Sequence, residues 1–144
     1  MTRFGMILFC SLPVMAASAA AENLIESGQW KVTSNTVMNG AISPPQVKAR
    51  CLTPEQAGDL AKTFGPVSGT VNSTCEMVEH ALTPQRLKWH LQCTGQLDMD
   101  LTGEFSFDAP EHYSATIATA SSMLGRQLQA GRMSLEGQWV GECR

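Results

Sequence analysis

Alternation of apolar and polar residues is the feature that most constrains how this chain folds. A repeat of two residues is typical of strands that have one buried face and one exposed face. It runs through seven segments, namely 29–38, 46–51, 75–82, 86–93, 97–107, 112–120 and 126–143. The pattern predicts a mainly β fold in which about seven antiparallel strands form one curled sheet, a partial barrel.

In the last of these segments, the apolar residues switch from one face of the strand to the other. Leu128 falls on one face, whereas Met133, Leu135 and Trp139 fall on the other. One extra residue in a strand produces such a switch. We therefore expect a β-bulge at Gly131, where the parity changes.

Segment 53–64 departs from the alternation and has the pattern of a short helix. Thr53 is a favourable N-cap, Pro54 suits the first turn and Gln56 completes a capping box. The apolar stripe that follows consists of Ala57, Leu60, Ala61 and Phe64. We expect one short helix after the second strand, with this stripe on the inner face of the sheet.

Two consecutive segments, 86–93 and 97–107, have complementary polar faces. The first has a basic row and the second an acidic row, formed by Arg86, Lys88 and His90 and by Asp98, Asp100 and Glu104. When the apolar faces of the two segments are matched in an antiparallel pair, these rows lie against each other. The register is therefore specified from both faces.

The first 21 residues have the layout of a cleavable secretory signal. Arg3 precedes an apolar run at 4–15, and Ala-x-Ala triplets of small residues follow it. The run is shorter than the roughly 20 residues of a membrane span, and Cys10 follows Phe9 rather than the small residue of a lipoprotein signal. We expect residues 1–21 to be removed, which leaves a single domain at 22–144 in the periplasm.

Charge narrows the range of partners. The formal net charge is −3 and becomes −4 when Arg3 is lost with the signal. No cluster of Lys and Arg stands out, so nucleic acid and anionic membrane surfaces are not expected partners.

Four cysteines remain in 22–144, and an even number in an exported chain indicates two disulfides. Their wide spacing does not fit a zinc site. From the faces of the strands, our first choice is Cys51–Cys75 with Cys93–Cys143. The alternative is Cys75–Cys93 with Cys51–Cys143, which a three-residue loop at 83–85 would favour. The sequence leaves both sets open.

The tripeptide Gly-Gln-Trp occurs near both ends of this domain, at 28–30 and at 137–139. A curled sheet brings its first and last strands together, and Gly28 and Gly137 would leave room for an indole ring there. We interpret Trp30 and Trp139, and also Trp89 on an inner face, as structural residues.

These motifs follow one another in a fixed order: Gly-x-Trp at 28–30, CLTPEQA at 51–57, Cys75, WHLQCTG at 89–95, GEFSFD at 103–108, YSATI at 113–117 and Gly-x-x-x-Gly-x-Cys at 137–143. In that order they resemble the exported bacterial proteins classed as domain of unknown function 3617. The resemblance covers nearly the whole mature chain. It implies a periplasmic protein with four structural cysteines, and it implies no activity.

The Gly-x-Trp opening and the C-terminal cysteine are also similar to the lipocalins, eight-stranded barrels that hold one small apolar ligand. The chain departs from that family in two respects. It has a helix after its second strand, and it has no Thr-Asp-Tyr turn motif.

Reactive chemistry has few candidate residues. A metal site can be drawn from His80 and His90 with Asp98 or Asp100, but two strand histidines and a carboxylate are also typical of an exposed polar face. The sequence has no Gly-x-Ser-x-Gly elbow and no phosphate-binding loop. We therefore expect no metal and no cofactor.

The sequence favours a non-enzymatic binding or interaction module over an enzyme. Its partner would be a small apolar ligand or an envelope protein, and a ligand would occupy a cavity between helix and sheet lined by Phe64, Trp89, Leu101 and Phe105. Two alternatives stay open, a metal-dependent or other hydrolytic enzyme and a lipocalin-like ligand carrier.

Overall fold

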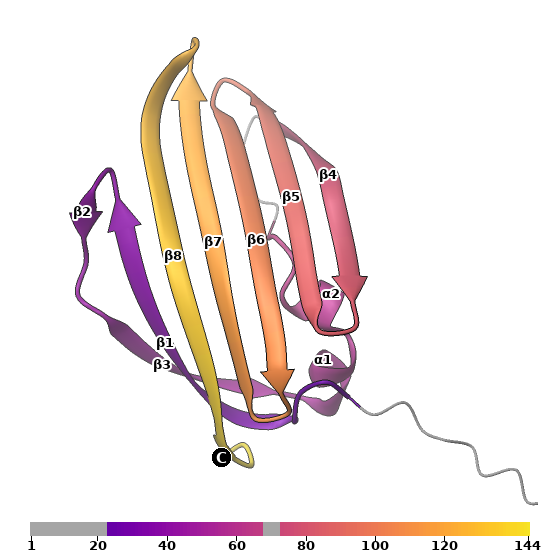
Figure 1. The fold of residues 1–144 in the computed structure, drawn as a ribbon. Coiled ribbons are helices and arrows are strands. Elements are labelled where there is room, and N and C mark those ends of the chain that lie inside the picture. The colour runs from indigo at the N-terminus through magenta and orange to yellow at the C-terminus, as the bar shows by residue number, and fades with distance from the viewer. Residues whose placement is uncertain (1–22, 68–72) are drawn as a thin grey trace, which may run out of the picture.

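The computed structural model describes residues 23–67 and 73–144, which form one antiparallel sheet of eight strands and two short helices (Figure 1). The strands are β1 Gly28–Met38, β2 Ala41–Ile42, β3 Gln46–Leu52, β4 Ser73–Thr83, β5 Arg86–Gly95, β6 Asp98–Ala109, β7 His112–Met123 and β8 Arg126–Gly141. The helices are α1 Pro54–Gly58 and α2 Leu60–Thr63. The expected mainly β, curled antiparallel sheet is confirmed.

The sheet is open, with the order β2-β1-β8-β7-β6-β5-β4 and with β3 paired to β1. Sequence analysis predicted about seven strands, and the additional one is the two-residue strand β2. It pairs with the end of β1 across Asn39 and Gly40, both of which have positive φ. Because β4 and β3 lie at opposite edges and do not pair, the molecule is a partial barrel and not the closed barrel of a lipocalin.

The two faces of the sheet differ in character. The concave face carries the core, and its largest fully buried side chains include Trp30, Tyr113, Phe107 and Leu87. On the convex face the predicted charge rows meet, with Arg86 Nη1 3.2 Å from Glu104 Oε1 and His90 Nε2 2.9 Å from Asp100 Oδ2. These pairs are partly or well exposed, so they contribute mainly to register.

The predicted helix is present but is divided in two. Thr53 and Gln56 form the expected capping box. Asp59, with φ −128° and ψ 73°, ends α1, and its carboxylate then accepts a hydrogen bond from the Lys62 N–H at the start of α2. Asp59 therefore ends one helix and begins the next, and α2 places Phe64 over the sheet.

Our first choice of disulfides, Cys51–Cys75 with Cys93–Cys143, is wrong. The structure pairs Cys75 with Cys93, with Cα atoms 4.0 Å apart, and Cys51 with Cys143, at 5.5 Å. The reason is the register of the β4–β5 hairpin, in which Cys75 lies directly opposite Cys93.

This register does not come from a three-residue loop at 83–85, which the alternative pairing assumed. Thr83 pairs with Arg86, so the turn has two residues. The pairing then slips by one residue between Met77 and Glu79, which makes Val78 the extra residue of a bulge. A shorter turn and one bulge together bring the cysteines opposite each other.

The bulge expected at Gly131 is also misplaced. In β8 the pairing with β7 slips between Gln129 and Gln127, so Leu128 is the extra residue. Gly131 is paired regularly, and a Cβ atom there would press on the side chain of Met38. The glycine lets the end of the Met38 side chain lie close to β8 and does not form a bulge.

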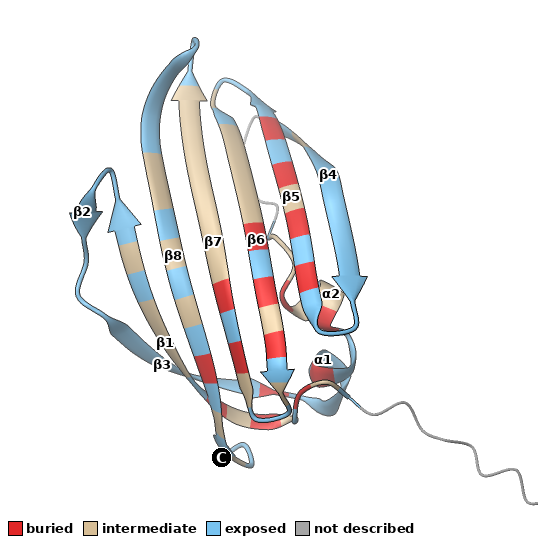
Figure 2. Cartoon of the chain, in the orientation of Figure 1, coloured by how far each residue is buried: buried red, intermediate tan, exposed pale blue. Residues whose placement is uncertain are grey.

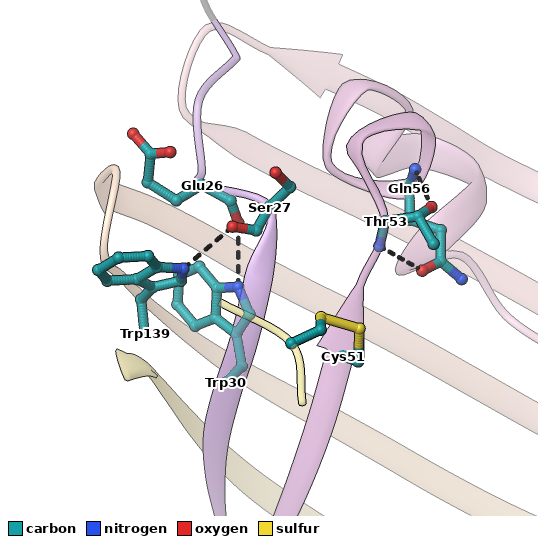
Figure 3. The surroundings of a disulfide bond; sticks show 8 residues. Glu26, Ser27, Trp30, Cys51, Thr53, Gln56 and Trp139 are labelled. Carbon is teal, nitrogen blue, oxygen red and sulfur yellow. Dashed lines mark hydrogen bonds between the residues drawn. A yellow bond between two sulfur atoms is a disulfide. The ribbon is translucent and has the colours of Figure 1, made fainter. Parts of the chain in front are cut away.

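Trp30 and Trp139 lie directly opposite each other on β1 and β8, as partners in the ladder (Figure 3). Their indole N–H groups donate to the carbonyl oxygens of Glu26 and Ser27, at 3.0 and 3.1 Å. A Cβ at Gly28 would collide with Trp139, as expected, whereas Gly137 makes room for the ring of Tyr113 and not for an indole. The two ends of the domain therefore meet around this pair.

The expected signal at 1–21, including Cys10, lies outside the described residues. Within 23–67 and 73–144, no helix has the length and apolar character needed to cross a membrane.

Candidate ligand-binding site

A cavity of about 610 Å³ lies between the segment that follows α2 and the concave face of the sheet. Its lining includes Phe64, Trp89, Leu101 and Phe105, the four side chains from which we predicted such a cavity. The prediction of a space between helix and sheet is confirmed. The strand pattern and the helical stripe had each indicated which side chains face inward.

Phe64 forms the covered end of this cavity. Its ring centroid lies 5.3 Å from that of Phe105, 5.4 Å from Phe107 and 5.0 Å from Tyr113. Tilted and edge-on contacts at such distances are favourable. The helix segment is thereby packed onto the core at one end of the concave face.

Trp89 joins the helix segment to the sheet through a hydrogen bond. Its Nε1–H donates to the carbonyl oxygen of Phe64 at 2.9 Å, in a buried position. Gly103 lies opposite Trp89 on β6, and a Cβ at Gly103 would overlap the indole ring. The indole can therefore lie flat across β6, with its one polar group satisfied.

The rest of the concave face extends beyond the helices. On β6, β7 and β8 the buried residues gather near the helices, and the parts of these strands farther away are less covered (Figure 2). Leu101, Ile117 and Leu135 on these strands, and Val32 on β1, are each only partly buried, and all four line the cavity. This wall is apolar and incompletely covered by the chain.

Two cations stand at the rim. Trp30 pairs with Arg50 and Val32 with Lys48, so both basic side chains of β3 share the concave side, and both line the cavity. The Arg50 guanidinium donates to the Thr63 carbonyl oxygen at 3.2 Å and lies 5.0 Å from the centroid of the Phe64 ring. Burial raises the pKa of the Tyr113 hydroxyl, and the nearby Arg50 charge partly offsets this.

Of the four side chains considered for a metal site, His90 and Asp100 meet, but His80 and Asp98 do not join them. His80 lies on the concave side, 3.2 Å from the Ala61 carbonyl oxygen, whereas His90 contacts Asp100 on the convex side. Asp98 accepts a hydrogen bond from the Gly95 N–H in the β5–β6 turn. Among the described residues, no group of three such side chains is arranged to hold a metal ion.

Asp100, a member of that set, has a lowered pKa. The hydrogen bond from His90 lowers the pKa of the Asp100 carboxyl most, burial partly opposes this effect, and a hydrogen bond from Gln92 lowers the pKa further. The pair links β5 to β6 across the convex face. Its geometry serves the register of the sheet.

A polar cluster that sequence analysis missed surrounds His112. The His112 Nδ1 atom lies 2.7 Å from Asp108 Oδ1, and its Nε2 atom lies 3.1 Å from Glu136 Oε1. The Asp108 hydrogen bond, followed by that of Glu136, raises the pKa of His112. The spacing of Asp108 and His112 across the β6–β7 turn was a usable signal, whereas Glu136 arrives only through the pairing of β7 with β8.

Comparison with known proteins identifies a family but no characterised relative. A family model described as a protein of unknown function (DUF3617) matches residues 25–143, a range that contains every strand, both helices and both disulfides. No curated protein matches the chain, and no solved structure matches it.

Proposed function

This chain belongs to the DUF3617 family of proteins of unknown function, and from that premise we propose that it is a periplasmic protein that binds a small apolar molecule in the cavity below Phe64. In this role the protein is a carrier or sensor of its ligand and not an enzyme. The observation behind this proposal is the cavity on the concave face, where apolar side chains from the sheet and the helix segment converge.

The size and lining of the cavity carry this proposal. Small-molecule sites typically measure about 300–1,000 Å³ and are mostly apolar with a few polar groups. The volume of about 610 Å³ falls within that range. A hollow on the convex face is smaller, at about 420 Å³, and is lined largely by charged and polar side chains such as Lys88, His90 and Arg132.

Incomplete burial of the wall supplies the driving force. Val32, Leu101, Ile117 and Leu135 pack against the core but keep part of their surface exposed. A ligand that covers them would gain roughly 25 cal/mol for each Å² of apolar surface removed from water. Binding therefore completes a core that the chain leaves unfinished.

The periplasmic location rests on the apolar leader at 4–15 and on the two disulfides. Disulfides form and persist in oxidising compartments such as the periplasm. Cleavage of the leader and export are part of the proposal.

An envelope protein is the other partner that we considered. It would dock on an exposed apolar patch or pair with an exposed edge strand, and β4 is such an edge, with Met77 and Val78 both exposed. The bulge at Val78 interrupts regular pairing, however, and bulged edges resist the addition of another strand. We therefore favour the small ligand.

Filling the cavity tests the proposal. Ile117 and Ala118 are neighbours on β7, and only Ile117 lines the cavity. We expect Ile117→Trp to abolish the fluorescence gain of the neutral probe N-phenyl-1-naphthylamine, because the larger ring occupies the site. The control Ala118→Trp places the same ring on the convex face and should leave the titration unchanged.

Circular dichroism would establish that both variants fold. The cavity is not a ligand site if both variants bind the probe as the wild type does, or if the wild type does not bind the probe at all.

A further inference from the structure

The charge at the cavity rim has one sign. Among the described residues, the charged members of the lining are Lys48 and Arg50, and none is acidic. The molecule as a whole is acidic, with a formal net charge of −3. A pair of cations beside an apolar cavity is therefore a local exception in this chain.

The two cations differ in how far they are already engaged. Arg50 donates one hydrogen bond to the Thr63 carbonyl oxygen and stacks over Phe64, which leaves further guanidinium N–H groups available. Lys48 makes no ion pair or hydrogen bond with any described residue. Its ammonium group therefore has no partner among the described residues, although Lys48 lines the cavity.

Spacing also suits a shared anion. Residues i and i+2 of a strand lie about 7 Å apart and point to the same side. Side chains as long as lysine and arginine span that gap easily. One anionic group of two or three oxygens can therefore reach both cations, while a chain attached to it extends along Val32 and Leu135 into the apolar part.

We propose that the ligand is a single-chain amphiphile whose anionic headgroup, a carboxylate or a phosphate monoester, is held by Lys48 and Arg50 at the rim. This inference rests on the proposed function and specifies its ligand class. The apolar chain supplies most of the affinity, and the headgroup selects among chains of equal length.

Four amphiphiles with the same twelve-carbon chain separate the headgroup from the chain: dodecanoate, dodecyl phosphate, dodecanol and dodecylammonium. Each is titrated, below its aggregation concentration, into wild-type protein that holds N-phenyl-1-naphthylamine, and displacement of the probe gives its affinity. We expect one or both anions to bind about fivefold or more tightly than dodecanol, and dodecylammonium to bind most weakly, as expected when one partly exposed ion pair is gained or opposed. The stronger of the two anions identifies the headgroup chemistry.

The variant Lys48→Gln assigns the effect to the rim. It should lower the affinity for the preferred anion about fivefold and leave dodecanol unchanged. Lys31→Gln is the matched control, because Lys31 lies on the neighbouring strand opposite Ala49, on the convex side. That variant should bind all four compounds as the wild type does.

The outcomes distinguish the two proposals. Equal affinity for the charged and neutral headgroups in the wild type overturns the headgroup inference and leaves the apolar site in place. An anion preference that survives in Lys48→Gln overturns the role of Lys48. Failure of every amphiphile to displace a probe that binds the wild type overturns the amphiphile inference, whereas failure of the probe itself to bind overturns the proposed function.

Discussion

At the scale of single residues, Trp89 and Gly103 act as one unit. The indole crosses β6 only because position 103 has no side chain, and in that position its N–H reaches the Phe64 carbonyl oxygen. Sequence analysis identified Trp89 as structural but did not identify Gly103 as its partner. The partnership depends on register, since the two residues are 14 positions apart in the chain and meet as a ladder pair.

Substitution of Gly103 by alanine should therefore destabilise the protein. The added methyl group displaces the indole and weakens its hydrogen bond, and overpacking of this kind costs about 1–3 kcal/mol. Urea unfolding of Gly103→Ala measures the loss. Gly58→Ala is the control, because a Cβ at Gly58 meets only Asn23 Oδ1 at 3.6 Å; a comparable loss there would contradict the explanation.

His112 should make stability depend on pH in a defined direction. Asp108 and Glu136 raise its pKa above 6.5, so its contribution is complete below the unfolded value and is lost as pH rises through the raised folded value. We expect the difference in unfolding free energy between wild type and His112→Gln to be largest below pH 6.5 and to shrink as the pH rises above it. Chemical unfolding on both sides of this pH checks it, and a difference that grows with pH would be inconsistent with the ion pairs.

At the scale of elements, alternation predicted the strands well but could not place their irregularities. Val78 and Leu128 are the extra residues of two bulges, and each is an apolar residue that fits either face of its strand. The choice of disulfides depended on the sum of a turn length and a bulge, which no local pattern determines. This is why Cys75 was first assigned to Cys51 and not to Cys93.

The cavity could be predicted only in part, because alternation shows the inner face of some strands and not of others. Phe64, Trp89, Leu101 and Phe105 belong to elements whose inner face is clear from their apolar residues. In β3 the alternation separates Val47 and Ala49 from Lys48 and Arg50, but it does not show which set faces inward. Pairing with β1 decides this, and it turns the basic set towards the concave side.

At the scale of the whole molecule, the two disulfides close loops of very different length. Cys51 and Cys143 are separated by 92 positions, and Cys75 and Cys93 by 18. The first ties the edge strand β3 to the segment after β8 near the paired tryptophans. The second reinforces a hairpin that is already closed by its ladder.

Loss of the long-range bridge should therefore cost more. The loop-entropy relation gives about 4.6 kcal/mol for Cys51–Cys143 and about 3.2 kcal/mol for Cys75–Cys93. Denaturant unfolding of the two double-serine variants compares them directly. A larger loss for the Cys75 and Cys93 variant would show that strain or residual structure, not loop length, dominates.

The positions of these bridges also bear on how a guest molecule would come and go. Cys51 stands just before α1 and Cys75 lies near the start of β4, so the stretch carrying both helices is covalently anchored on either side. While both disulfides are intact, they restrict detachment of the helices from the sheet. A ligand would then enter and leave over the rim that carries Lys48. Reduction of the disulfides would shorten the residence time of the bound ligand.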